Sequence, residues 1–270
     1  MHCPPSAGPW PDTLVAALLG DLRTGESPRV LGISGLQGTG KSTLAAQLVA
    51  AANTRGLRGA MLSLDDLYLD HRVRAALARD VHPLLATRGP PGTHEVALGL
   101  SVFEAVRAGA PVRLPRFDKL DDRRLPEDTW PQAGALDLLV FEGWCVGATA
   151  EGDAALDAPI NALECEEDPD GTWRRWCNTA LVRDYPALWA GIDTLLFLQP
   201  PGFEIVPTWR WQQEQTLQAA ASGRTGMSRA QVERFVQHYE RVSRQVLKVL
   251  PRVADMVVRL DAERSIVSTD

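Results

Sequence analysis

The sequence lacks an excess of basic residues. It contains 28 Lys and Arg against 34 Asp and Glu, so its formal net charge is −6. Proteins that bind nucleic acid usually carry a basic face. The composition therefore argues against a general nucleic-acid binder, and an anionic ligand would have to be held by local Arg and Lys side chains.

Cysteines and long apolar runs are also scarce. Cys3, Cys145, Cys165 and Cys177 form no C-x-x-C pair and have no nearby histidine at zinc-finger spacing, so we expect free thiols in a reducing compartment. No apolar run approaches the ~18 residues that span a bilayer. The N-terminus has prolines but no basic segment followed by an apolar core, so no secretory signal is expected. These absences predict a cytoplasmic protein without membrane contact.

The order of apolar and helical segments indicates an α/β protein. Apolar runs predict buried strands at 29–34, 59–64, 136–141, 193–198 and 255–260. Helical patterns lie between them, near 13–22, 41–54, 68–80, 93–108, 207–221 and 228–248. Asp12 and Thr93 are the predicted N-caps of the helices that follow them. Continuously apolar strands separated by helices favour a mainly parallel sheet of five strands, covered on both faces.

The remaining segments fit a single domain over residues 1–270, a length that can bury a sizeable core. Residues 1–12 are expected to form a loose tail. Residues 145–185 are acidic and carry Trp173 and Trp176, and we interpret them as a partly helical insertion. There is no internal repeat or low-complexity segment.

Residues 35–42, G-L-Q-G-T-G-K-S, fill the pattern G-x-x-x-x-G-K-[ST] between the first predicted strand and the next helix. In that context the pattern forms a phosphate cradle, because backbone N–H groups turn inward and the helix N-terminus adds partial positive charge. Lys41 would reach the β- and γ-phosphates and the Ser42 hydroxyl would hold Mg²⁺. We therefore predict ATP and Mg²⁺ as cofactors. The predicted nucleotide-binding residues are Gly35, Gln37, Gly38, Thr39, Gly40, Lys41, Ser42 and Thr43.

Acidic residues close two other predicted strands. Asp65 and Asp66 follow strand 59–64, and Glu142 follows strand 136–141. In a parallel sheet ligands lie beyond the carboxyl ends of the strands, so these acids should lie near the phosphate cradle. We predict Asp65 as the catalytic base, Asp66 as a substrate contact, and Ser42, Asp65 and Glu142 as metal ligands. A helix cap or a solvated turn is the alternative role for the two aspartates.

Two segments offer cations for an anionic acceptor. Residues 88–94, R-G-P-P-G-T-H, precede a predicted helix, and Arg88 and His94 are candidate substrate contacts there, with a plain turn as the alternative. In residues 115–124, Arg116 and Lys119 are candidate carboxylate or phosphate contacts beside Arg123 and Arg124. A charge run of this kind can equally be a solvated face.

Residues 207–229 are a predicted lid. Arg210, Arg224 and Arg229 lie in or between the two late helices. In phosphoryl transfer, cations stabilise the charge that develops on the transferred group. We predict Arg210 as a catalytic lid arginine, beside Lys41 and Asp65.

Five segments together resemble D-glycerate 3-kinase, the plant-type glycerate kinase with bacterial and fungal relatives. They are residues 32–42, 63–69 (S-L-D-D-L-Y-L), 88–94, 141–147 (F-E-G-W-C-V-G) and 209–215 (W-R-W-Q-Q-E-Q), within a similarity that runs from about 29 to 260. Glu95 stands where the family form G-T-H-D has Asp. The resemblance places the chain in the group of phosphoribulokinase, uridine kinase and pantothenate kinase.

The resemblance implies a P-loop NTPase three-layer sandwich with helical insertions and a lid. It implies ATP-dependent phosphorylation of the primary hydroxyl of D-glycerate, with D-glycerate as the small-molecule partner and 3-phospho-D-glycerate as product. The acid after the second strand is the base in this group, and here that position is Asp65. The resemblance also supports Arg210 as a lid residue and His94 as a substrate residue.

Two other functions stay open from the residues. A uridine- or pantothenate-type kinase would use the same phosphate cradle for another hydroxylated acceptor. An ATP-binding regulatory module would have no acceptor, and the position of Asp65 at a strand end argues against it. Substrate-induced ATP turnover would distinguish a kinase from such a module.

Overall fold

The computed structural model describes residues 9–20, 22, 28–220 and 226–270. A six-stranded sheet with the order β10-β9-β8-β1-β7-β2 forms its centre. The sheet strands are β1 (Arg29–Gly35), β2 (Gly59–Ser63), β7 (Leu138–Gly143), β8 (Thr194–Gln199), β9 (Met256–Leu260) and β10 (Ile266–Thr269). The paired neighbours among the first five are parallel, and β10 is antiparallel to β9. The predicted parallel sheet is confirmed, but its strand number was wrong because the short, half-exposed β10 carries no continuous apolar run.

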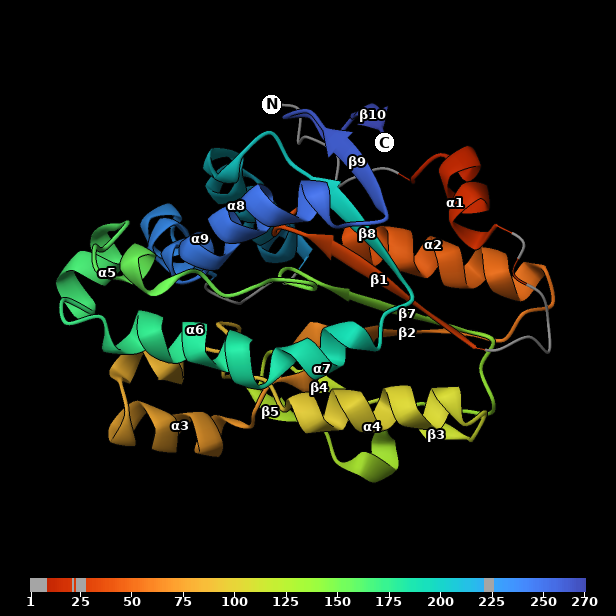
Figure 1. Ribbon diagram of the computed structural model, residues 1–270, viewed down its shortest axis with the longest axis horizontal. Coiled ribbons are helices and arrows are strands. Elements are labelled where there is room, and N and C mark those ends of the chain that lie inside the picture. Colours follow the sequence, from red (N-terminus) through yellow and green to blue (C-terminus); the bar gives the residue numbers. More distant parts are fainter. Residues whose placement is uncertain (1–8, 21, 23–27, 221–225) are drawn as a thin grey trace.

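Helices cover both faces of this sheet, which confirms an α/β sandwich of three layers (Figure 1). The helices are α1 (Asp12–Leu19), α2 (Lys41–Thr54), α3 (His71–Asp80), α4 (Val96–Arg107), α5 (Ala162–Glu167), α6 (Thr172–Arg183), α7 (Tyr185–Ala190), α8 (Val206–Ala220) and α9 (Arg229–Val249). Leu48 of α2 packs with Ile33 and Val140 on one face. On the other face, Leu188 of α7 packs in a second core with Phe141.

Short strand pairs lie outside the main sheet. β3 (Val112–Arg113) pairs with β6 (Gln132–Ala133), and β4 (Phe117–Asp118) pairs with β5 (Arg123–Arg124). The second pair forms a hairpin over residues 117–124, which we call the 117–124 hairpin. It follows α4 in the chain and packs against the turn after β2.

Three predicted helix starts were misplaced. α1 begins at Asp12 itself, with Pro11 at the N-cap. The helix predicted from residue 68 begins at His71, where the Asp70 side chain caps it. The helix predicted from Thr93 begins at Val96, because the Thr93 hydroxyl instead accepts from Gly89 N (2.9 Å) and donates to Pro90 O (2.7 Å) inside the preceding loop.

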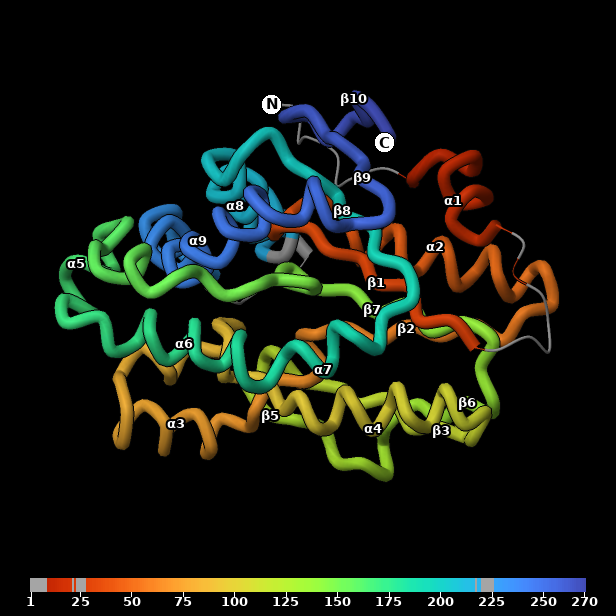
Figure 2. Tube along the Cα trace, viewed as in Figure 1, coloured from red at the N-terminus to blue at the C-terminus, as the bar shows by residue number. Residues whose placement is uncertain are grey.

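The end of the predicted loose tail is docked. Of residues 1–12, the first eight lie outside the described residues, but the Trp10 side chain is buried at 6% exposure. Its indole Nε1 donates to Gly40 O (3.1 Å), and its backbone N donates to Gln47 Oε1 (2.9 Å). Figure 2 shows α1, the helix that follows Trp10, beside α2. Burial of the large indole therefore attaches the chain before α1 to the start of α2.

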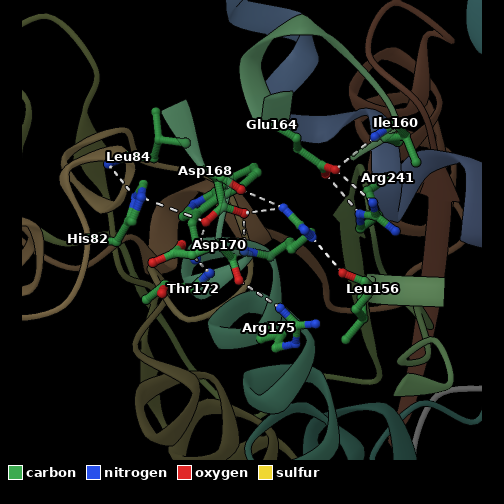
Figure 3. A network of polar contacts seen from close by, with 12 residues as sticks. His82, Leu84, Leu156, Ile160, Glu164, Asp168, Asp170, Thr172, Arg175 and Arg241 are labelled. Atoms are coloured by element: carbon green, nitrogen blue, oxygen red, sulfur yellow. Dashed lines mark hydrogen bonds and ion pairs between the residues drawn. The ribbon is translucent and has the colours of Figure 1, made fainter. Parts of the chain in front are cut away.

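Residues 145–185 fold back onto α9 through buried ion pairs. Glu164 of α5 accepts two hydrogen bonds from Arg241 of α9, at 2.8 and 2.7 Å (Figure 3). Arg174 of α6 pairs with Asp168 at 3.1 Å, and His82 Nε2 lies 3.7 Å from the same aspartate. Removing one partner of such a pair would leave an uncompensated buried charge. The Arg241–Glu164 pair therefore fixes the segment against α9, whereas the Arg174–Asp168 pair stabilises the segment internally.

Two expectations from composition can be compared with the structure. Cys145, Cys165 and Cys177 are free thiols, while Cys3 lies outside the described residues. Within the described ranges, no helix is both long and apolar enough to cross a bilayer.

Candidate active site

The phosphate loop joins β1 to α2 at the carboxyl end of β1. Gly38 and Gly40 have φ values of 89° and 87°, a backbone region that favours glycine. A Cβ atom at Gly38 would lie only 2.5 Å from Cβ of Trp209 in α8. Glycine therefore allows the loop to turn and to lie directly against α8, with Lys41 as the first residue of α2.

Ser42 and Glu142 meet beside this loop. Ser42 Oγ donates to Glu142 Oε1 at 3.0 Å, and Glu142 is only 3% exposed. The second carboxylate oxygen, Oε2, is buried without a hydrogen-bond partner in the described structure. Burial raises the pKa of Glu142, although the charge of Lys41 opposes the shift.

These two side chains have the chemistry of a magnesium site that a bound nucleotide would complete. Mg²⁺ prefers oxygen ligands and is commonly held by one or two carboxylates together with substrate phosphates. The unpartnered Glu142 oxygen and the Ser42 hydroxyl supply that chemistry. Among the described residues, no group of three or more His, Cys, Asp and Glu could hold a metal by itself.

Asp65 lies in the short 3₁₀ turn Leu64–Leu67, directly after β2. Its Oδ1 accepts from the Tyr68 hydroxyl (2.6 Å) and its Oδ2 accepts from Lys119 Nζ (2.6 Å). Burial would raise the pKa of Asp65, but the Lys119 ammonium and the two hydrogen bonds outweigh it and lower the pKa below its usual range. Asp65 is therefore ionised at neutral pH.

Asp66 has different surroundings from Asp65. It accepts from Phe117 N and from Arg116, both at 3.2 Å, and so anchors the start of the 117–124 hairpin. Burial raises the pKa of Asp66 against the charge of Arg116. Asp66 and Arg116 are not among the residues lining the cavity described next.

A cavity of about 500 Å³ opens over the phosphate loop. The predicted site residues that line it are Gln37, Gly38, Gly40, Lys41, Ser42, Thr43, Asp65, Arg88, Lys119 and Arg210. The lining residues that sequence reasoning missed are Tyr68, Trp144, Gln212, Gln213, Thr216, Phe235, Tyr239 and Arg264. Tyr68, Trp144, Gln212 and Gln213 fall inside segments of the family resemblance, which was the available signal.

Arg88 is held from two sides. Its guanidinium donates to Asp122 Oδ1 (2.6 Å), and Asp122 also pairs with Arg74, which is only 1% exposed. The Tyr239 hydroxyl of α9 donates to the Arg88 carbonyl (2.8 Å). Gly89 has φ 111°, and a Cβ there would meet the Tyr239 ring at 2.7 Å. The glycine lets α9 close over the loop that carries Arg88.

His94 lies behind the cavity wall. It is 6% exposed, its Nδ1 is 2.6 Å from the Tyr185 hydroxyl, and its ring centroid is 5.1 Å from that of Tyr68. Burial lowers the pKa of His94 to about 4, with the charge of Asp65 opposing the shift. The ring is therefore neutral near pH 7, and its predicted contact with substrate stays a prediction.

The arginines of the predicted lid have three different positions. Arg210 lines the cavity, pairs with Glu214 (3.2 Å) and lies 5.8 Å from the Phe235 ring centroid. Arg229 pairs with Glu233 and is 70% exposed. Arg224 lies outside the described residues. Arg210 is thus the member of the group that the fold brings to the site.

Arg264 reaches the phosphate loop from beyond β9. Its Nε donates to Gly38 O (2.7 Å) and its guanidinium carbon lies 4.8 Å from the Trp209 ring centroid. Arg264 has φ 68°, unusual for a residue with a side chain. No sequence signal identified this residue, because it follows the last predicted strand in a short polar turn.

Known proteins resemble the chain in sequence and in fold, although no protein-family model matches it. It is 34% identical over 222 residues to the uncharacterized kinase mug58 of Schizosaccharomyces pombe, which covers 78% of both chains. It is 29% identical over 229 residues to the chloroplastic D-glycerate 3-kinase of Arabidopsis thaliana, covering 78% of this chain and 46% of that one. The structure of a D-glycerate 3-kinase from Cryptococcus neoformans superimposes with a TM-score of 0.76 at 25% identity, covering 96% of this chain and 95% of the other.

These relatives agree with the site. A phosphate loop, a lysine at the start of α2 and carboxylates at the ends of β2 and β7 are the parts that phosphoryl transfer requires. The protein is an ATP-dependent phosphotransferase, and the chain belongs to the same kinase family as mug58 and is similar to D-glycerate 3-kinases in sequence and fold.

Proposed function

We propose that this kinase transfers the γ-phosphoryl group of Mg·ATP to the primary hydroxyl of D-glycerate and forms 3-phospho-D-glycerate. Two similar proteins are named D-glycerate 3-kinases. The observation that carries the proposal is the common cavity of Lys41, Asp65, Arg88 and Lys119. It combines a phosphate cradle, an ionised carboxylate and two cations suited to a small acidic acceptor.

The nucleotide would be held by the loop amides and Lys41, as in other phosphate loops. Ser42 and Glu142 would hold Mg²⁺, which neutralises charge on the phosphate oxygens when bound. We assign Asp65 to the acceptor rather than to direct metal ligation, because it is bonded to Tyr68 and Lys119, whereas Ser42 is bonded to Glu142.

Asp65 would orient the acceptor hydroxyl and take its proton. The acceptor oxygen bonds to the γ-phosphorus while the bond from that phosphorus to the β,γ-bridging oxygen breaks, and ADP leaves. A carboxylate with a lowered pKa is a weak base, but phosphoryl transfer depends more on positioning and electrostatics than on proton removal.

The acceptor carboxylate would contact cations of the cavity that lie outside the phosphate loop. Lys119 and Arg88 are the candidates, and both belong to segments tied to the 117–124 hairpin. Arg210, from α8, would stabilise charge on the transferred phosphoryl group. Closure of the predicted lid, residues 207–229, of which 221–225 lie outside the described residues, is part of this proposal.

The test is ADP release from Mg·ATP with D-glycerate, L-glycerate, uridine, pantothenate and ribulose 5-phosphate as acceptors. The proposal expects selective stimulation by D-glycerate, with the phosphate at the 3-position by ³¹P and ¹³C NMR. A second set with Mg²⁺ removed by EDTA and then restored tests the metal. Stimulation by uridine or pantothenate alone would instead assign the other kinase type.

We propose a cytoplasmic location from the sequence, but the Arabidopsis relative is named as chloroplastic. Fractionation of the producing cell, with the enzyme followed by antibody, would decide between the compartments.

A further inference from the structure

The Lys119 ammonium forms an ion pair with Asp65, the carboxylate to which we assign proton transfer. Its Nζ lies 2.6 Å from Asp65 Oδ2, while the Tyr68 hydroxyl lies 2.6 Å from Oδ1. Each oxygen of the Asp65 carboxylate therefore accepts a hydrogen bond from a side chain of the protein. A hydroxyl or a water molecule that donates to Oδ2 has to share that oxygen with the Lys119 ammonium, whose positive charge lowers the pKa of the carboxyl.

The 117–124 hairpin does not need this ion pair to stay in place. Asp66 holds its start through Phe117 N, and Asp122 is held by Arg74 and Arg88. Arg124 closes its end on the Tyr68 carbonyl at 2.9 Å and on Glu95.

The Lys119 side chain itself is 54% exposed. The hairpin backbone is held by other contacts, and most of the Lys119 side chain is exposed. The ammonium can therefore change its partner while the backbone stays in place. Ion pairs between partly exposed groups are weak, so a second carboxylate can compete for the ammonium.

Three other cations of the cavity are paired with groups other than Asp65. Arg88 pairs with Asp122, and Arg210 pairs with Glu214. Arg264 is bonded to the Gly38 carbonyl, and Lys41 stands in the phosphate loop. Among the cations of the described cavity, Lys119 is thus the one that pairs with the proposed base. The reaction requires this ion pair to open.

We propose, on the basis of the proposed function, that Lys119 is the specificity-determining residue that makes Asp65 available only to acidic acceptors. The acceptor carboxylate takes the ammonium from Asp65, and Oδ2 then accepts the proton of the acceptor hydroxyl. The acceptor oxygen bonds to the γ-phosphorus and ADP leaves. Water and neutral alcohols have no carboxylate that could bind Lys119. Asp65 therefore stays paired with Lys119 when they bind.

The experiment measures acceptor-free ATP hydrolysis, with and without D-lactate, which is D-glycerate without its 3-hydroxyl. In the wild type, D-lactate should draw Lys119 away and raise hydrolysis about 10-fold, a part of the 10²–10⁴ that a general base contributes. Lys119→Met should show this raised rate without D-lactate and no response to it. Lys119→Arg keeps the charge and should remain suppressed and responsive.

A selectivity measurement complements it. In Lys119→Met the ratio of kcat/KM for D-glycerate to that for glycerol should fall about 100-fold. The D-glycerate carboxylate loses its contact with Lys119, whereas the hydroxyl groups of both substrates meet an Asp65 without an ion-pair partner. Thermal unfolding verifies that each variant is folded, as expected for a side chain exposed over half its area.

An unchanged acceptor-free rate in folded Lys119→Met would overturn the inference. So would D-lactate that binds by calorimetry to the wild type without stimulating hydrolysis. Both results can occur while D-glycerate is still phosphorylated, and then only the role of Lys119 fails. Failure of the proposed function itself would be recognised by an acceptor panel in which D-glycerate gives no product, and the rate in Lys119→Met would still test the restraint on Asp65.

Discussion

Ser42 Oγ donates a 3.0 Å hydrogen bond to Glu142 Oε1, although the two residues are separated by 100 positions. The parallel pairing of β1 with β7, with Ile33 opposite Glu142, produces this contact. The contact satisfies one carboxylate oxygen and leaves the other, Oε2, buried without a partner in the described structure. That oxygen is available to a bound Mg²⁺ ion.

Glu142→Gln should weaken the use of Mg²⁺. The amide keeps an oxygen for Ser42 but loses the negative charge, and changes at or near metal ligands typically cost 10–100-fold in metal affinity. We expect the Mg²⁺ concentration for half-maximal activity to rise about 10-fold or more in a titration at saturating ATP. Glu95→Gln, which removes a carboxylate bound to Arg124, is the matched control. Identical Mg²⁺ curves for Glu142→Gln and wild type would contradict the assignment.

Asp65→Asn should keep ATP binding and lose transfer. The substitution removes the group that accepts the hydroxyl proton, so kcat should fall about 10²–10⁴-fold. Lys41→Ala is the contrasting variant, because it removes the cation of the phosphate cradle and should impair nucleotide binding as well as turnover. Calorimetry with ATP and steady-state kinetics separate the two. Normal turnover by Asp65→Asn would show that another residue is the base.

The pH dependence of the reaction should follow the Lys119–Asp65 pair. Because Lys119 and Tyr68 lower the pKa of Asp65 against burial, the carboxylate stays ionised down to below its usual value of 3.8. Tyr68→Phe removes one donor and should raise that pKa. The acidic limb of the kcat/KM profile should therefore move to higher pH. If the acidic limb does not move, it reports the protonation of a group other than Asp65.

His94 should make stability depend on pH between 6.5 and 4. Burial lowers the pKa of His94 from 6.5 to about 4, so in this window the unfolded chain binds a proton that the folded chain does not. The free energy of unfolding therefore falls as the pH falls, by about 2 kcal/mol at pH 5 for this group. His94→Asn, compared with wild type by urea unfolding at pH 7.5 and 5.0, should lose that part of the dependence. His238, whose pKa burial also lowers to about 4, remains in both proteins. Equal pH dependence would refute the prediction.

Trp10 should support the phosphate loop from outside the cavity. Trp10→Ala removes a buried indole and should cost about 3 kcal/mol of unfolding free energy. Trp10→Phe keeps most of the packing but loses the bond to Gly40 O, and should cost about 1 kcal/mol. Because Gly40 precedes Lys41, both variants should also raise KM for ATP a few-fold. Leu14→Ala, in the same core, should reduce stability with KM unchanged. A normal KM in both Trp10 variants would limit Trp10 to packing.

The sequence predicted the parallel sheet and the edge where the site lies because both depend on local patterns. Apolar runs identified the five parallel strands, and the glycine-rich loop with Lys41 lies at the end of one of them. Once strands are parallel, their carboxyl ends share one edge, so Asp65 and Glu142 had to lie near that loop. Apolar runs did not predict the half-exposed β10, because partly buried and exposed residues alternate in Ile266–Thr269.

The amino-acid sequence by itself determined the phosphate loop, the strand-end acids and the kinase family. Only the tertiary structure decided between neighbouring candidates. It placed Asp65 in the cavity and turned Asp66 toward Phe117, and it placed Arg88 at the cavity and His94 behind it. It also brought Arg264 to Gly38 across 226 positions of sequence. The physical reason is that local patterns fix which element forms and where it ends, whereas the partner of each side chain depends on how distant elements pack together.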